Sequence, residues 1–85
     1  MSGGTFDYQQ YKIDQIAEMI ESYIHKNKKE YWMNYSEQTM REFQNAVIFL
    51  KTAAVYTQRI DWLLAGDDDE ETFHKRLKHD LQNSK

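Results

Sequence analysis

The stretch YSEQTMREFQNAVIFLKTAAVYTQRIDWLLAG, from Tyr35 to Gly66, decides the fold of this 85-residue chain. Ser36 is a favoured N-cap, because its hydroxyl oxygen can accept from a free backbone N–H of the first turn. Tyr35 and Met40 have the spacing of a hydrophobic staple around that cap. Gly66 suits the left-handed residue that ends a helix. The stretch therefore predicts one helix over residues 37–65, about 40 Å long at 1.5 Å per residue.

Apolar residues cover most of the circumference of this helix. Two adjoining series recur at helical spacing, one made of Phe43, Val47, Leu50 and Ala54, the other of Phe49, Ala53, Tyr56, Ile60 and Leu63. An ordinary surface helix has one apolar stripe, whereas a helix that is apolar nearly all round is usually central. We therefore expect neighbours to cover this helix on most sides.

A shorter helix is predicted before the central one, over residues 8–26. Its buried stripe has members three and four positions apart: Ile13, Ile16, Ala17, Ile20 and Ile24. Asp7 and Gln10 have capping-box spacing at its start. Asn27 can cap its end. This helix and the central one are expected to pack antiparallel.

A third helix is predicted over residues 69–82. Asp68 and Glu71 again have capping-box spacing, within an acidic run that suits the positive end of a helix. Phe73, Leu77 and Leu81 then form a thin apolar stripe. We expect this short amphipathic helix to fold back on the end of the central one.

The composition limits the class of protein. Eighty-five residues form a single domain, residues 1–85, and a chain this short buries only about 60–65% of its unfolded surface. The absence of cysteine excludes disulfides and thiolate sites, and a formal charge of −3 argues against general nucleic-acid binding. No apolar run approaches the roughly 20 residues that span a membrane, and no signal-peptide pattern is present. We expect a soluble, cytoplasmic, all-α domain of three helices.

Two carboxylate patterns bear on metal chemistry. Residues Glu71 to His74 have the Glu-x-x-His spacing of di-iron bundles, but such sites need two of these motifs and two further carboxylates. Glu18 and Glu21, with the later acids, weakly resemble the clusters that hold magnesium in all-helical nucleotide pyrophosphohydrolases. We predict no catalytic residue, metal site or cofactor. A metal-dependent nucleotide hydrolase is the alternative function.

The segment from Gln58 to Trp62 interrupts the apolar pattern with charge. Asp61 continues the apolar seam, and an unpaired buried carboxylate costs several kcal/mol. The available cations are Arg59 and, if the third helix folds back, His74 and Arg76. One interpretation is a salt-bridged lock for the turn; the other is a pocket floored by Trp62 that takes an anionic or planar ligand. The predicted binding site consists of Arg59, Asp61, Trp62, His74 and Arg76.

Three aromatic residues, Tyr31, Trp32 and Tyr35, stand between the first two helices. They either close one end of the core or form a contact surface for a partner protein, since Trp and Tyr are common in both settings.

Several segments together resemble a group of small proteins from bacteriophages and prophages. They are the opening residues 1–8 (MSGGTFDY), the helix start at 35–37 (YSE), residues 58–63 (QRIDWL), residues 66–68 (GDD) and residues 73–77 (FHKRL). Many members of the group begin Met-Ser-Gly-Gly and share the Arg-Ile-Asp-Trp-Leu and Phe-His-x-Arg-Leu segments. The resemblance implies a phage or prophage setting within a bacterial host.

Small non-enzymatic phage proteins often act by binding host factors, including components of antiviral systems. We therefore predict an accessory binding protein that inhibits a host factor by capturing a host protein or a small signalling ligand. We also predict a homodimer. Two shorter helices cannot easily cover so apolar a central helix, large exposed apolar patches usually mark interfaces, and two-fold pairing is the commonest solution.

Overall fold

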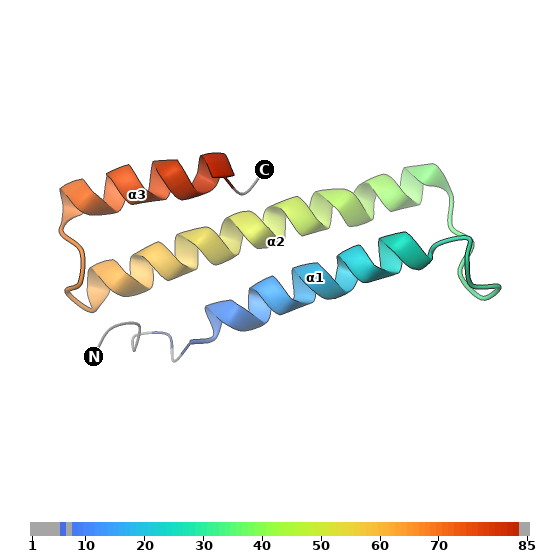
Figure 1. Cartoon of the computed structure of the whole chain (residues 1–85), viewed down its shortest axis with the longest axis horizontal. Coiled ribbons are helices and arrows are strands. Elements are labelled where there is room, and N and C mark those ends of the chain that lie inside the picture. Colours follow the sequence, from blue (N-terminus) through green and yellow to red (C-terminus); the bar gives the residue numbers. More distant parts are fainter. Residues whose placement is uncertain (1–5, 7, 84–85) are drawn as a thin grey trace.

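A computed structural model describes residues 6 and 8–83, which form three helices (Figure 1). They are α1 (Gln10–Lys26), α2 (Glu37–Leu64) and α3 (Glu70–Asn83). α1 and α2 are antiparallel neighbours, and α3 returns along the second half of α2. The predicted all-α class and the long central helix, 28 residues in the structure, are confirmed.

The three helices lie side by side in a single layer (Figure 1). α2 contacts both of the other helices, which lie on opposite sides of it. The molecule measures 50 × 24 × 13 Å. It is thus about half as thick as it is wide. The radius of gyration is 16.0 Å, against about 12 Å for a compact domain of this length.

The hydrophobic core is correspondingly small. Among the described residues, the buried hydrophobic side chains are Ala17, Met33, Met40 and Val47. Large apolar side chains of α2 remain open, with Ile48 57% exposed and Phe49 72% exposed. The expected cover of α2 on most sides is therefore not supplied within the described chain. α1 and α3 each cover one flank, and nothing within the described chain forms a second layer.

The ends of α2 follow the sequence prediction closely. The hydroxyl oxygen of Ser36 accepts from the backbone N–H of Thr39 at 3.2 Å. At the other end Gly66 has φ 87°, and its N–H and the following one donate to carbonyls of the last turn. This is the Schellman arrangement. An added Cβ at Gly66 would meet no atom within 4 Å, so glycine is needed for its backbone angle and not for space.

α1 begins at Gln10, two residues later than the predicted start. Tyr8 has φ 60°, a left-handed angle that a helix cannot contain, and Gln9 takes the N-cap position without a side-chain bond. Gln10 does not take part in the predicted capping box, because the Gln10 side chain donates to Gln58 of α2 instead. Asp7, the other predicted member, lies outside the described residues.

Asn27 closes α1 and holds the connection to α2. Its side-chain amide donates to the carbonyl of Tyr35 at 3.1 Å, and its Oδ1 accepts from the Tyr35 N–H at 2.9 Å. Within the connection, Lys28 has φ 68° and its N–H donates to the Met33 carbonyl at 2.7 Å. These bonds turn the chain back and place Met33 in the core.

The start of α3 uses a different aspartate from the predicted one. Asp69 Oδ1 accepts from the N–H of Thr72 at 2.7 Å, so Asp69 is the N-cap. Asp68, which was expected to form a capping box with Glu71, is instead buried. In a run of five acids, only tertiary contacts distinguish the capping residue from its neighbour.

We predict that the Asp69 cap makes α3 sensitive to acid. The bond from Thr72 lowers the pKa of the Asp69 carboxyl below its ordinary value, so the unfolded chain binds a proton more readily than the folded one. The contribution of the cap is complete above about pH 4, the ordinary carboxyl pKa, and is lost as the pH falls through the lower folded value. Amide hydrogen exchange of residues 70–74 should accelerate there in the wild type.

The matched variant is Asp69→Asn, because asparagine can also cap a helix but does not titrate in this range. Its exchange in this turn should depend less on pH than that of the wild type. Asp67→Asn, a change at an exposed neighbour, should behave as the wild type does. Identical acid profiles for the wild type and Asp69→Asn would show that the cap is not the sensitive group.

Candidate functional site

Arg59 and Trp62, two of the five predicted site residues, are in contact near the end of α2. The guanidinium carbon of Arg59 lies 4.3 Å from the ring centroid of Trp62. Arg59 Nε also binds Asp80 Oδ2 of α3 at 2.7 Å. The Arg59 side chain is only 11% exposed. Arg59 therefore fixes α3 against α2 and presents little surface to a ligand.

Asp68 completes this ionic contact from the turn. Its Oδ1 lies 3.1 Å from Arg76 Nη1, and its Oδ2 lies 3.6 Å from Arg59 Nη1. The longer contact is ionic without a hydrogen bond, since both of its atoms are buried and lack a hydrogen-bond partner. The Asp68 side chain is 1% exposed. The turn is thus locked by salt bridges, as one interpretation held, but with Asp68 and Asp80 as the carboxylates.

Asp61, the carboxylate that we expected in the lock, faces α1. It is fully buried and accepts from the Phe6 backbone N–H at 3.2 Å and from Gln10 Nε2 at 3.3 Å. In the described part of the chain no ion pair joins it to Arg59, His74 or Arg76. The reason is geometric, because two residues along a helix differ by about 200°, so Asp61 and Arg59 point to different neighbours.

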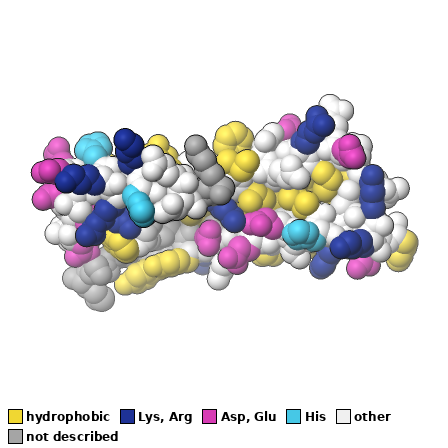
Figure 2. All heavy atoms as spheres, turned by 45° about the horizontal axis from the view of Figure 1, so that its top comes forward, with side chains coloured by type: hydrophobic (Ala, Val, Ile, Leu, Met, Phe, Trp, Pro, Cys, Tyr) yellow, Lys and Arg dark blue, Asp and Glu magenta, His cyan; other side chains and the backbone are white. Residues whose placement is uncertain are grey.

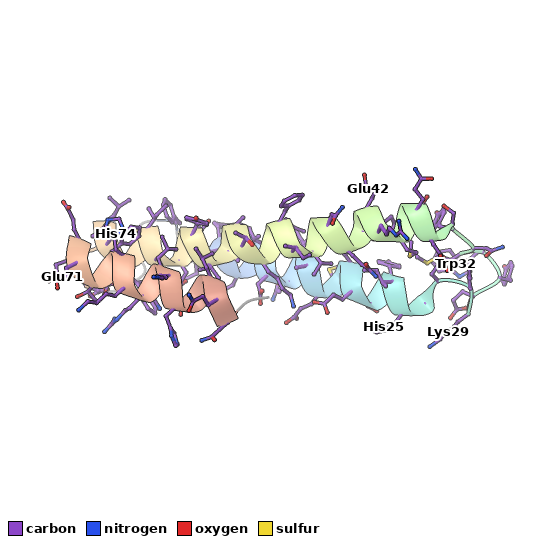
Figure 3. All side chains as sticks on the ribbon, turned by 90° about the horizontal axis from the view of Figure 1, so that it is seen from above. His25, Lys29, Trp32, Glu42, Glu71 and His74 are labelled. Atoms are coloured by element: carbon purple, nitrogen blue, oxygen red, sulfur yellow. The ribbon has the colours of Figure 1, made fainter. Side chains whose placement is uncertain are left out.

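His74 takes no part in the lock. It is exposed, and its ring lies edge-on to Phe73 with centroids 5.2 Å apart. Figure 3 places it with Glu71 at the end of the molecule where α3 begins. Glu71 pairs with Lys75 at 3.6 Å, and both side chains are largely exposed. Over residues 6 and 8–83, no three His, Asp or Glu side chains lie close enough together to hold a metal ion.

The predicted aromatic surface lies at the opposite end of the molecule, where Figure 3 shows Trp32 beside the connection from α1 to α2. Tyr31 is 99% exposed, Trp32 56% and Tyr35 46%. Met33 is the residue of this connection that enters the core. Because the molecule is 50 Å long, this surface and the lock cannot belong to one site.

The structure contains a groove that was not predicted from the sequence. It has a volume of about 610 Å³ and runs over α2 between α1 and the end of α3. α1 contributes Gln10, Tyr11, Asp14 and Glu18, α2 contributes Lys51, Ala54, Val55, Gln58 and Trp62, and α3 contributes Asp80 and Asn83. Of the predicted site residues, only Trp62 lines it. No local signal in the sequence marks this groove, because its walls come from three helices.

The groove has an acidic wall. Asp14 and Glu18 lie one turn apart on α1, and neither makes an ion pair within the described part of the chain. Lys51, the cation of the groove, binds Glu21 Oε1 at 2.7 Å. This bond to Glu21 raises the pKa of Lys51, and the charges of Asp14 and Glu18 add a smaller effect in the same direction. Figure 2 shows acidic side chains gathered near the middle of the molecule.

Two further features make the groove suited to binding. Gln10 is 2% exposed, and its Oε1 has no hydrogen-bond partner although its Nε2 is engaged. Beyond the Lys51–Glu21 pair the groove continues into a second hollow of about 430 Å³, which Ile48 and His25 help to line. α3 contacts only the second half of α2 (Figure 1), so this part has no third wall.

Comparisons with known proteins give no match to a family model, a curated protein or a solved structure. None of the described helices combines the length and the apolar character that crossing a membrane requires.

We predict that Asp68 stabilises the attachment of α3 more than any other acid of the turn. Asp68→Asn would leave Arg59 buried with one carboxylate fewer, and breaking a buried ion pair costs about 3–5 kcal/mol. Amide exchange of residues 70–83 should accelerate strongly, whereas that of residues 37–58 should change little. The matched control is Asp67→Asn at the exposed neighbouring position. Equal effects of the two substitutions on amide exchange would show that the Asp68 ion pairs do not hold α3 in place.

Proposed function

We propose that this protein is a small binding protein that captures a basic segment of a partner protein in the groove between α1 and α3. In the phage or prophage setting that the sequence resemblance implies, the partner is a host protein, such as a component of an antiviral system. The observation that carries the proposal is the unpaired acidic wall of a groove that also presents aromatic rings.

The charges favour a cationic ligand over an anionic one. Asp14 and Glu18 have no cation of their own, while the charge of Lys51 is already engaged by Glu21. The ring of Tyr11 also lines the groove and attracts cations through its face, whereas a face of Trp62 already carries Arg59. A Lys or Arg side chain entering the groove would therefore gain the two carboxylates and the Tyr11 ring, whereas a phosphate-bearing signalling ligand would meet two carboxylates. Of the two kinds of capture that we expected from the sequence, that of a protein is favoured.

The size of the groove agrees with this occupant. Pockets that bind small molecules measure about 300–1,000 Å³, and the groove lies within this range at about 610 Å³. It is open along its length and continues into the second hollow past Lys51. An extended peptide can thus follow the layer while its long side chains enter the groove.

The alternative of a metal-dependent nucleotide hydrolase lacks comparable support. Such an enzyme needs several carboxylates around one magnesium ion that bridges phosphates. Glu18 lines the groove, but Glu21 is bound to Lys51. Turnover of nucleotides with added magnesium or manganese would establish the hydrolase and overturn the binding proposal.

We predict that a basic peptide binds at Trp62. The chain contains two tryptophans, so the Trp32→Phe protein reports on Trp62 alone. A synthetic octapeptide of alternating Lys and Gly should change its emission, and added salt should weaken the effect. Asp14→Asn and Glu18→Gln should each lower the affinity about two- to fivefold, as expected for the loss of an exposed charge pair.

The control substitution is Glu71→Gln. It removes the same charge at the beginning of α3, whereas the groove lies at the end of that helix, and it should leave the affinity unchanged. Equal binding of a Glu-Gly octapeptide would refute the electrostatic argument. The Trp62→Phe protein provides the reverse experiment, because it reports on Trp32. A response there, with none at Trp62, would move the binding surface to the aromatic residues 31–35.

A further inference from the structure

The chain exposes more surface than a monomer of its mass normally does. Its accessible surface is 6430 Å², whereas a folded monomeric protein of 10.3 kDa exposes about 5,400 Å². The excess is about 1,000 Å². One partner of a standard protein–protein interface buries about 800 Å². Because it is summed over all 85 residues, this surplus is an upper limit to the area that one interface would remove.

The surplus includes an apolar face that we call the open face. On α1 it comprises Ile16, Met19 and Tyr23, at spacings of three and four residues, which are 48%, 58% and 42% exposed. On α2 it comprises Phe49, Ala53 and Tyr56, of which Phe49 is 72% and Tyr56 43% exposed. These spacings put each set on one side of its helix.

The open face lies on the side of the layer away from the groove. At 100° per residue, Ile16 and Tyr23 fall on the flank of α1 opposite the groove residues Asp14 and Glu18. Ala53 falls likewise on the flank of α2 opposite Val55 and its groove neighbours. The layer therefore has one polar, hollowed face and one apolar face. α3 covers neither, because it lies beside α2 (Figure 1).

We propose that the open face binds the open face of a second copy of this chain, forming a two-fold symmetric dimer of two stacked helix layers. Domains normally bury their apolar faces between at least two layers, and this chain supplies one. The four hydrophobic side chains that are buried among residues 6 and 8–83 are a small core for a chain of this length. The second layer is therefore needed for folding itself.

This requirement identifies the occupant. A partner needed for folding must be present whenever the chain is present and in equal number, which a second copy always satisfies. Joining identical faces about a two-fold axis also gives a closed assembly that cannot extend into a fibre. The dimer does not depend on the proposed function, because both grooves remain on its outer faces. Two grooves on one particle would add avidity for a partner with repeated basic segments.

The dimer is tested by mass and by stability. Sedimentation of the wild-type protein at high micromolar concentration should give twice 10.3 kDa. Its melting temperature should rise with protein concentration, as it does when folding and association are linked. Phe49→Glu should halve the mass or abolish folding, because it places a charge within the open face. Ile48→Glu, the matched change at the adjacent residue on the groove side, should remain a dimer.

Cross-linking tests the dimer even if the Phe49→Glu protein does not fold. The chain has no cysteine, so a single introduced cysteine is unique. Ala53→Cys should give a two-chain product with a short bis-maleimide, whereas Ile48→Cys should give none. A wild-type protein that sediments at 10.3 kDa with a concentration-independent melting temperature would overturn the dimer. Cross-linking through position 48 and not 53 would overturn the assignment of the face.

Discussion

The register between α1 and α2 is the constraint on which the rest of the structure depends, and the buried carboxylate of Asp61 helps to set it. No cation of the described residues pairs with Asp61, which accepts from two N–H donors, the Phe6 backbone and the Gln10 side chain. Gln10 is held in turn by Gln58. Moving α1 by one turn would remove these donors and leave a buried charge unpaired, at a cost of several kcal/mol. The apolar contacts between α1 and α2 fix the register less strictly, because the core between these helices is small.

α3 is attached by a different kind of interaction, and this decides where the molecule can move. None of its residues is buried, and the contacts that fix it are the ion pairs of Arg59 with Asp68 and Asp80 and of Arg76 with Asp68. Regions with little buried apolar surface open first. α3 is also a wall of the groove, so its opening would change the groove while α1 and α2 keep their register. The chain thus separates the part that defines its fold from the part that can adapt.

The sequence predicted those features that depend on neighbouring residues. Ser36 and Gly66 end α2 as expected, because caps are formed by atoms within a few residues of each other. Asp61 was recognised as buried, since its position on the helix follows from spacing alone. Its partners were not, because Gln10 is 51 residues away and was assigned to a local capping box. Asp69 caps α3 in place of Asp68 for the same reason. Two adjacent acids give the same local signal, and only contacts with distant residues distinguish them.

The coverage of α2 could not be predicted for a related reason. Its sequence shows that most of its circumference is apolar, but this pattern is the same whether the cover is part of the chain or another molecule. The structure shows that α1 and α3 cover the flanks and leave Phe49 in solvent. The groove was missed because its wall residues are far apart in the sequence and each is ordinary on a surface helix.

The charged residues that fix α3 come from one part of this architecture. Residues 58–63, 66–68 and 73–77 form the end of α2, the turn and the beginning of α3. They include Arg59, Asp68 and Arg76 of the lock, and also Asp61 of the register network. Arg59 and Arg76 meet at Asp68 there, whereas Asp14 and Glu18, the acidic wall of the groove, come from α1. The charged residues of these segments thus build the frame that positions α3, whereas the acidic charge of the proposed binding groove comes largely from α1.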